Sequence, residues 1–233
     1  MKTPISIIIP VHNEEKILQT NVVKIMDELK KKRLNYEIIL GENGSTDNTL
    51  KVGKQLNKKY GNKVKIFHTY QKGVGAGIAI AIKNTKYKKI IELPIDLSCN
   101  LDFIDKASKL LETNDLVIGS KILGTQNRHW WISFLGAGYY NLANFLLDLN
   151  YTDYSVGAKA YSKDLVYPLL EKIDNGSFYM TQFTYAAQKN KLKIVEIPTT
   201  IVDKRESKFN FNKEIVYRTK NLVKLTVKHK LGK

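Results

Sequence analysis

Short apolar runs alternate with longer amphipathic segments over the first half of the chain. The apolar runs are rich in isoleucine, leucine and valine, which is typical of strands buried on both faces, and the longer segments have helical spacing. The pattern predicts strands at 5–11, 36–40, 64–68, 89–93 and 115–119, and helices at 14–31, 47–60, 76–84 and 101–112. This alternation indicates an α/β fold with a mostly parallel sheet flanked by helices.

The regular alternation of strand and helix patterns ends after residue 119. Residues 130–149 are apolar and aromatic with a single charge, Asp148, but their serine, asparagines and glycines make a poor membrane span. A helix or helix pair in a membrane interface and a buried helical hairpin explain this segment equally well. Beyond it the pattern predicts a strand at 157–161, helices at 162–172 and 178–190, and a strand ending at 197–198.

The C-terminal segment is strongly basic, with eight basic residues and one acidic residue between Lys208 and Lys233. A helix from 213 to 230 would place one set of apolar residues on a single stripe: Ile215, Val216, Leu222, Val223 and Val227. Lysines with the same spacing would lie on another face: Lys213, Lys220, Lys224 and Lys228. We expect this helix to lie on an anionic membrane. The alternative is that its stripe packs on the body of the protein.

Length and composition indicate one globular domain with an appendage. The chain has 233 residues, of which 43% are hydrophobic and 26% charged. We expect a catalytic unit at 1–212, with halves at 1–120 and 121–212, and a basic tail at 213–233. The chain contains no apolar run of membrane-spanning length, and its start lacks the pattern of a signal peptide. These features predict a cytoplasmic protein, peripheral on the cytoplasmic face of a membrane.

The number and spacing of the cysteine and histidine residues, together with the net charge, limit the classes of function that the protein can have. Cys99 is the single cysteine, and the four histidines have no zinc-ligand spacing, which excludes a disulfide scaffold and a structural zinc module. The net charge of +16 favours anionic partners, namely nucleic acid, phosphorylated small molecules or acidic membranes. We expect no nucleic-acid partner, because only four residues are arginine and no nucleic-acid-binding motif is present.

Polar residues follow three of the predicted strands, at 10–15, at 42–49 and at 92–98. Ligands of parallel α/β sheets bind beyond the carboxyl ends of the strands, so these groups are expected to meet at one crevice. Asn43 and Gly44 predict a tight turn, and Thr46 or Asp47 is suited to cap the helix that follows. A turn and a cap with no further role is the alternative for this segment.

A glycine-rich segment, 73–77, lies between a predicted strand and a predicted helix. It is not a dinucleotide motif, because Ile78 occupies the position of the last glycine. Two interpretations are equally supported: backbone amides at Gly73 and Gly75 that approach an anion, or glycines that allow close helix-sheet packing. The adjacent Lys72 favours the ligand interpretation slightly.

Taken in order, these motifs resemble the family 2 glycosyltransferases of GT-A fold, particularly the dolichyl-phosphate mannose or glucose synthase branch. The proline-x-x-asparagine-glutamate motif matches Pro10, Asn13 and Glu14, and the metal motif falls on Pro94 to Asp96. Further matches follow in the family's order over 5–208: Glu42 to Ser45, Gly73 to Gly77, Gly119 to Lys121, Thr152 to Lys159, Glu196 to Pro198 and Val202 to Lys208. The resemblance implies a Rossmann-like GT-A fold with interfacial helices.

The resemblance also implies an activity. It is the inverting transfer of a hexose from a nucleotide sugar, of the GDP-mannose or UDP-glucose type, to a polyprenyl or dolichyl phosphate at the membrane surface. The implied nucleotide-binding residues are Pro10, Val11, His12, Asn13, Glu14, Glu42, Asn43, Lys72, Gly73 and Gly75. The implied catalytic residues are Asp96, Asp153, Lys121, Lys159, Arg205 and Lys208. A divalent metal, Mg²⁺ or Mn²⁺, is expected on Asp96 and Ser98.

The chain departs from the family pattern at several carboxylates. Pro94 replaces the first aspartate of the metal motif, and Glu42 and Asn43 replace the aspartate pair near the nucleoside. Transfer to a glycan hydroxyl, with Asp153 as base, and a catalytically silent binding scaffold therefore stay open as alternatives. A phosphate acceptor is already an anion and needs positive charge rather than a strong base.

Overall fold

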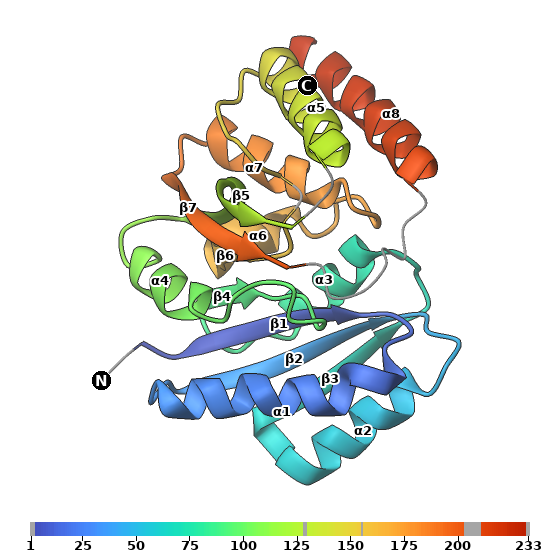
Figure 1. The fold of residues 1–233 in the computed structure, drawn as a ribbon, viewed down its shortest axis with the longest axis vertical. Coiled ribbons are helices and arrows are strands. Elements are labelled where there is room, and N and C mark those ends of the chain that lie inside the picture. The colour runs from blue at the N-terminus through green and yellow to red at the C-terminus, as the bar shows by residue number, and fades with distance from the viewer. Residues whose placement is uncertain (1–2, 128–129, 155, 203–210, 232–233) are drawn as a thin grey trace.

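The computed structural model describes residues 3–127, 130–154, 156–202 and 211–231. They form a seven-stranded sheet in the order β3-β2-β1-β4-β6-β5-β7, in which only β6 runs antiparallel to its neighbours. The strands are β1 (Ile5–Val11), β2 (Tyr36–Asn43), β3 (Val64–Thr69), β4 (Lys89–Glu92), β5 (Leu116–Gln126), β6 (Lys159–Ser162) and β7 (Ile194–Ile201). The expected α/β fold is confirmed (Figure 1).

Helices cover both faces of the sheet, as the chain's alternating pattern predicts. The helices are α1 (Glu15–Lys31), α2 (Thr49–Tyr60), α3 (Val74–Lys83), α4 (Phe103–Leu110), α5 (Trp130–Leu147), α6 (Lys163–Val166), α7 (Tyr179–Lys189) and α8 (Phe211–Lys230), with short 3₁₀ turns at Gly61–Lys63 and Tyr167–Leu169. Residues of α1, α2 and α4 pack on one face, and those of α3, α6 and α7 on the other.

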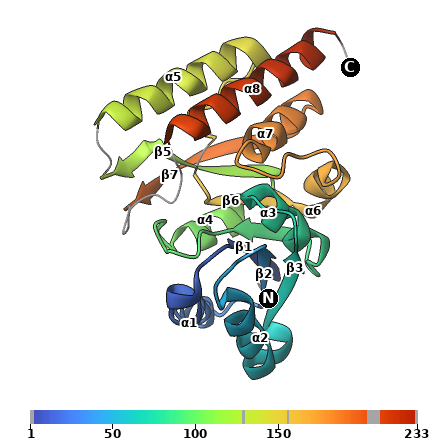
Figure 2. The ribbon, with the colours of Figure 1, turned by 90° about the vertical axis from the view of Figure 1, so that its right-hand side faces the viewer.

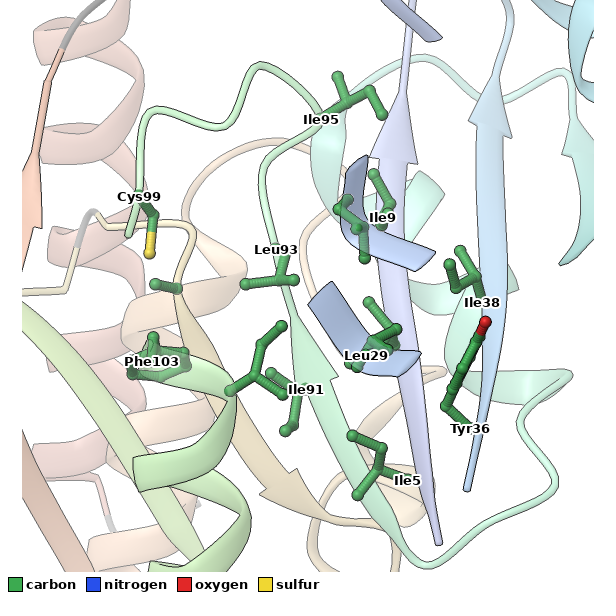
Figure 3. Packing of buried hydrophobic residues seen from close by; sticks show 14 of the residues in the cluster. Ile5, Ile9, Leu29, Tyr36, Ile38, Ile91, Leu93, Ile95, Cys99 and Phe103 are labelled. Carbon is green, nitrogen blue, oxygen red and sulfur yellow. The ribbon is translucent and has the colours of Figure 1, made fainter. Parts of the chain in front are cut away.

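Alternation of side chains along each buried strand separates two cores. Ile5, Ile7 and Ile9 of β1 contact the core beneath α1 and α4, whereas Ile8 faces the core beneath α3 and α7. Figure 3 shows the first core, where Leu29 of α1 lies over β1 and Phe103 of α4 lies farther across the sheet, beyond Ile91 of β4. Burial of apolar area on both faces holds the central strands in place.

A third, smaller cluster joins α5, α7 and α8 beside the sheet. It contains Tyr140, Ala143 and Leu147 of α5 together with Leu222 of α8. Figure 2 shows α5 and α8 running next to each other over this side of the molecule. Residues 130–147 therefore form a single helix, and the expectation of a helical hairpin is wrong. Over 136–147, the part of this helix whose side chains are described, Tyr140, Ala143 and Leu147 are buried, whereas Leu142 and Phe145 are 44% and 82% exposed.

The basic tail is helical, as expected, but its apolar residues divide between two faces. Leu222 is fully buried against α5, while Val216, Val223 and Val227 are each more than half exposed. The predicted single stripe is therefore wrong: at about 100° per residue, Leu222 lies on the side of Ile215 and about 100° or more around the helix from the three valines. None of the helices in the described ranges is long and apolar enough to cross a bilayer.

Strand ends also differ from the predictions. β5 extends to Gln126 because residues 125–126 pair with β7 after an irregularity that follows Ser120, and their polar side chains carry no strand pattern. The expected boundary at 120/121 falls inside β5, so both halves of the proposed catalytic unit contribute to the same sheet. The tail is not separate from them either, since α8 packs on α5.

Candidate active site

The carboxyl ends of β1, β2 and β3 lie side by side. Val11 is opposite Glu42, and Glu42 is opposite His68. β4 pairs with the other side of β1 and ends at Glu92, next to the turn that contains Asp96. The strand ends named in the sequence thus reach the same edge of the sheet, as their parallel order requires. We call residues 10–15, 42–49, 68–77 and 92–98 at this edge the strand-end edge.

Glu42 lies at the base of this edge. It is 1% exposed, and its carboxylate accepts hydrogen bonds from the Ser45 amide and from the His68 ring. The His68 ring lies edge-on to that of Tyr70, with 4.6 Å between centroids. The carboxylate holds the Gly44 turn in shape. Its expected contact with a nucleotide stays a prediction.

Several polar contacts tie the loop after β1 to the loop after β2, including two in which the amide and the side chain of Asn48 donate to the Glu15 carboxylate. The His12 Nδ1 atom lies 3.1 Å from the Asn43 carbonyl oxygen. Asn13 has a φ of 54°, and its side chain accepts a hydrogen bond from the Thr46 amide at 2.8 Å. Other contacts bring the amides of Asn13, Glu14 and Glu15 to the side chains of Ser45, Thr49 and Asp47. The proline-x-x-asparagine-glutamate segment therefore shapes the edge beside Pro10 and Val11.

Glycines in the 73–77 segment allow close packing. A Cβ atom at Gly75 would lie 2.0 Å from the Asp174 carbonyl oxygen, and one at Gly77 would lie 2.9 Å from that of Gly41. The Ala76 amide donates to the Asn175 carbonyl at 3.0 Å. Helix-sheet packing is therefore confirmed for Gly77, whereas Gly75 packs on the loop at 174–176. The anion-binding role of Gly73 and Gly75 stays a prediction beside it.

Lys72 belongs to the same edge. Its side chain is exposed, and its Cγ atom lies 3.4 Å from where a Cβ atom of Gly44 would be. The lysine thus joins the turn after β2 to the turn after β3. A flexible ammonium group at this place is suited to an anionic ligand.

Asp96 projects from a tight turn after β4. The Leu97 amide donates to the Pro94 carbonyl at 3.3 Å, and Leu97 has a φ of 53°. One carboxylate oxygen of Asp96 accepts the Ser98 amide at 3.0 Å. This contact fixes the orientation of the carboxylate at the strand edge, where the resemblance places a metal ligand.

Lys121 and Asp153 form a buried ion pair next to β4 and β6. The Lys121 Nζ atom lies 2.9 Å from Asp153 Oδ2 and 3.0 Å from the Tyr140 hydroxyl. Lys121 is 5% exposed and Asp153 is fully buried. The interpretation in which Asp153 orients a cation is therefore supported by its contacts. Arg205 and Lys208, also predicted to be catalytic, lie outside the described residues.

Lys159 adds a second buried ammonium group to this ion pair. It is 1% exposed, and its Nζ atom donates to the Val156 carbonyl at 3.1 Å. Burial lowers the pKa of Lys159, and the carboxylates of Asp153 and Glu92 act in the opposite direction. We call Lys121, Asp153, Lys159 and Glu92 the buried ionic cluster.

Glu92 is a member of this cluster that the sequence interpretation missed. It lies opposite Lys159 on the neighbouring strand, and its carboxylate accepts hydrogen bonds from the hydroxyls of Tyr161 and Tyr179. Burial raises the pKa of Glu92 to about 6, although these two hydrogen bonds and Lys159 lower it. A glutamate that ends an otherwise apolar strand, Lys-Ile-Ile-Glu, was the available signal.

Glu196 of β7 was also missed as a site residue. Its carboxylate accepts the Thr152 amide at 2.9 Å, the Thr152 hydroxyl at 2.9 Å and the Asp153 amide at 3.2 Å. It therefore fixes the turn from which Asp153 reaches Lys121.

A family model described as "Glycosyl transferase family 2" matches residues 6–170, which include both the strand-end edge and the buried ionic cluster. The chain belongs to this family. It is a glycosyltransferase, and its sequence resembles curated members that act on dolichyl phosphate. The UDP-N-acetylglucosamine–dolichyl-phosphate N-acetylglucosaminyltransferase of Methanococcus voltae is 30% identical over 83% of this chain and 84% of that protein. The dolichyl-phosphate β-glucosyltransferase of Homo sapiens is 25% identical over 83% of this chain, which spans 65% of that protein.

Solved structures confirm the GT-A fold of this glycosyltransferase. Glucosyl-3-phosphoglycerate synthase from Mycobacterium tuberculosis, in complex with Mn²⁺, UDP and phosphoglyceric acid, superposes with a TM-score of 0.71. The match covers 97% of this chain and 78% of that one at 15% identity. A complex of the same enzyme with Mn²⁺, UDP and glucosyl-3-phosphoglycerate gives a TM-score of 0.70 at 16% identity. At these identities the likeness concerns the fold alone.

The donor set of this glycosyltransferase fits a divalent cation that binds together with a nucleotide. Asp96 supplies a carboxylate, whereas Pro94 supplies no ligand at the other position of the motif. Among the residues that the structure describes, no three histidine, cysteine, aspartate or glutamate side chains group as a metal site. Hard cations accept oxygen ligands from phosphates and water as well as from protein. Asp96 and Ser98 are thus suited to a cation whose other ligands come from a diphosphate.

Proposed function

We propose that this glycosyltransferase moves a hexose from a UDP-sugar to a polyprenyl phosphate of the dolichyl type. The observation that carries the proposal is the pair of buried lysines, Lys121 and Lys159, at the same sheet edge as the nucleotide motifs. The names of the curated relatives support a dolichyl-phosphate acceptor, and the Methanococcus relative supports a UDP-sugar donor.

The strand-end edge would hold the nucleotide. His12, Glu42 and the Gly44 turn would border the nucleoside. Lys72 would border the diphosphate together with residues 73–77, which include the first turn of α3 and which we call the glycine turn. Lys72 contributes positive charge, and main-chain amides supply hydrogen bonds to anions. A cation held by Asp96 and Ser98 would neutralise charge that develops on the leaving diphosphate.

The buried ionic cluster would act on the acceptor. A phosphate oxygen forms the new bond to the anomeric carbon while the bond from that carbon to the nucleoside diphosphate breaks, and attack from the opposite side inverts the configuration. The phosphate is already an anion, so no base has to remove a proton. Lys121 and Lys159 would attract it with little screening, because the buried lysines lie in a medium of low dielectric constant.

Transfer to a glycan hydroxyl is less well supported by this geometry. Such an acceptor needs a base, and Asp153 is the carboxylate suggested for that role. Its Oδ2 atom accepts hydrogen bonds from both the ammonium group and the amide of Lys121. The contacts of Asp153 therefore favour orientation of Lys121 over proton abstraction.

The outer face of α8 is the part of the molecule best suited to meet an anionic membrane. The exposed valines Val216, Val223 and Val227 lie between exposed lysines that follow the same helix, Lys213, Lys220 and Lys224. Apolar side chains flanked by basic ones are typical of helices that lie in the membrane interface. A cytoplasmic face for this contact follows from the same proposal, since anionic lipids are enriched there.

A binding panel tests both halves of the proposal with the full chain. We expect UDP with Mn²⁺ to raise the melting temperature more than GDP with Mn²⁺, because a ligand that binds the folded state stabilises it by mass action. We also expect farnesyl phosphate to bind and farnesol to bind far more weakly. Equal binding of the phosphate and the alcohol would contradict the role of the buried lysines. A response to GDP alone would contradict the choice of donor.

A further inference from the structure

The inner face of α8 contacts a loop that lies between the 3₁₀ turn at Tyr167–Leu169 and α7. The hydroxyl of Tyr217 donates to the Asp174 carboxylate, and its ring covers Gly176 so closely that a Cβ atom there would lie 2.3 Å from the hydroxyl oxygen. Burial and the neighbouring Asp174 carboxylate raise the pKa of Tyr217, so the phenol stays protonated and remains a donor.

A second set of polar contacts joins the same helix to the same loop. The Arg218 Nε atom lies 3.1 Å from the Ser177 hydroxyl and 2.7 Å from Glu214 Oε1. The Ser177 hydroxyl also donates to the Glu214 carboxylate. The part of α8 from Glu214 to Arg218 therefore holds both ends of residues 174–177, which we call the clamp loop.

The other side of the clamp loop packs on the glycine turn by backbone alone. A Cβ atom at Gly73 would lie 2.3 Å from the Asn175 carbonyl oxygen, and Gly75 is equally close to that of Asp174. The Ala76 amide donates to the Asn175 carbonyl. Because no side chain separates these segments, a shift of the clamp loop displaces the turn itself.

The Asp174 carboxylate links α8 to the backbone of the clamp loop. Its Oδ1 atom accepts the Gly176 amide at 2.8 Å, which shapes the clamp loop, and also accepts the Tyr217 hydroxyl. The Asp174 amide donates to the Gln182 side chain of α7 at 2.6 Å. Tyr217 is therefore the contact by which α8 fixes the residue that shapes the loop.

We infer that Tyr217 is a positioning residue for the donor site: through Asp174 it holds the clamp loop against which the 73–77 turn is packed. The inference rests on the proposed role of Gly73 and Gly75 in nucleotide binding. The two faces of α8 then have different roles: the valines face outward, toward the proposed membrane contact, while Tyr217 faces the clamp loop.

The test compares two tyrosines that both bind α8 to the body. Tyr217→Phe removes the hydroxyl at the clamp loop, and Tyr185→Phe removes the contact between Tyr185 and His229 Nδ1, 3.1 Å, near the other end of α8. We expect Tyr217→Phe to raise the Kd for UDP with Mn²⁺, and the KM of the UDP-sugar, about three- to tenfold. The KM of the polyprenyl phosphate should stay within about twofold, and Tyr185→Phe should change neither.

Two further measurements distinguish a failure of the inference about Tyr217 from a failure of the proposed donor site. Amide hydrogen exchange at 73–77 should become faster in Tyr217→Phe and stay unchanged in Tyr185→Phe. Gly176→Ala, whose added methyl group displaces the Tyr217 ring, should act like Tyr217→Phe. Unchanged exchange and UDP affinity in Tyr217→Phe, or an equal rise of both KM values, would overturn the inference. If exchange rises but the wild type binds no nucleoside diphosphate, the packing link stands and the proposed donor site is wrong.

Discussion

The strand-end edge and the buried ionic cluster are built in different ways, although they share one side of the sheet. At the strand-end edge, polar side chains such as Asn13 and Glu42 accept hydrogen bonds from backbone amides of neighbouring loops. In the cluster, Lys121 and Asp153 pair charge with charge away from water. The edge is thus held by contacts that shape loops, and the cluster by contacts whose loss leaves a buried charge. Substitutions at the edge should mainly affect ligand binding, whereas substitutions in the cluster should also destabilise the fold.

Asp96 is expected to give the largest effect. Asp96→Ala should lower turnover about 100- to 1000-fold, because it removes the carboxylate suited to hold charge beside the leaving diphosphate. The fold should be intact, since Asp96 lies on an edge turn. Asp102→Ala, at an exposed carboxylate nearby, is the control and should keep normal turnover. Wild-type turnover in Asp96→Ala, measured with saturating donor, would show that positive side chains alone support the leaving group.

Of the substitutions considered, that of Lys121 should lower the stability of the fold most. Lys121→Met should lower the free energy of unfolding by about 3 to 5 kcal/mol, because Asp153 stays buried without that cation. The matched control is Lys30→Met, which breaks an exposed pair with Asp27 and should cost no more than about 1 kcal/mol. Urea denaturation followed by circular dichroism gives both values. Similar values for the two variants would remove the distinction between edge and cluster.

Glu42→Ala should weaken binding of UDP by about 1 to 3 kcal/mol, the scale of a lost charged hydrogen bond. The carboxylate holds the Ser45 amide and the His68 ring, so its removal loosens the turn after β2. Calorimetry with Mn²⁺ present measures this loss. Glu37→Ala, at the opposite end of the same strand, should leave the affinity unchanged. Equal affinity in wild type and Glu42→Ala would exclude Glu42 from the donor site.

The raised pKa of Glu92 predicts that the free energy of unfolding depends on pH, and this effect comes from the buried ionic cluster and not from the strand-end edge. Its pKa is about 6 in the folded protein against an ordinary 4.5, so ionisation opposes folding. The stability it contributes is fully present below about pH 4.5 and is lost as the pH rises through about 6, by about 2 kcal/mol in total. The difference in unfolding free energy between wild type and Glu92→Gln should fall over that interval. A difference that is constant with pH would contradict the assignment.

Tyr161→Phe sharpens this prediction. The Tyr161 hydroxyl donates to Glu92 and lowers its pKa. Without that hydroxyl the pKa should rise further, and the loss of stability should continue to higher pH.

The smallest effect is expected on the outer face of α8. Lys224→Gln should weaken binding to anionic vesicles by about 1 kcal/mol at low salt, and Lys59→Gln on α2 should not. Substitution is a cleaner test than removal of the helix, because Leu222 is buried against α5. Equal sedimentation of both variants with the vesicles would place the membrane contact elsewhere.

The order of strands and helices could be predicted because buried strands and amphipathic helices have distinct periods. The strand ends at Pro10, Glu42 and Asp96 followed from that order, since parallel strands present their carboxyl ends together. The extension of β5 could not be predicted, because its polar residues pair with β7 only through long-range contacts.

Partners distant in the sequence account for most of what was missed. Glu92 looks like an ordinary polar strand end until Tyr161 and Tyr179 are placed beside it. The glycine turn gave no sign of the clamp loop, about 100 residues further along the chain, because backbone atoms make that contact. The apolar spacing of the tail likewise did not separate Leu222, which is buried against α5, from the valines that stay exposed.

The most direct test of the central claim is a transfer assay with the full chain, Mn²⁺ and vesicles that contain dolichyl phosphate. Labelled UDP-glucose and UDP-N-acetylglucosamine are offered in parallel, and dolichol replaces dolichyl phosphate in the control. The account predicts a labelled glycosyl phosphate lipid from at least one donor, formed with wild-type protein and lost with Asp96→Ala. Label on dolichol or on a glycan hydroxyl, or no product from either donor, would contradict it.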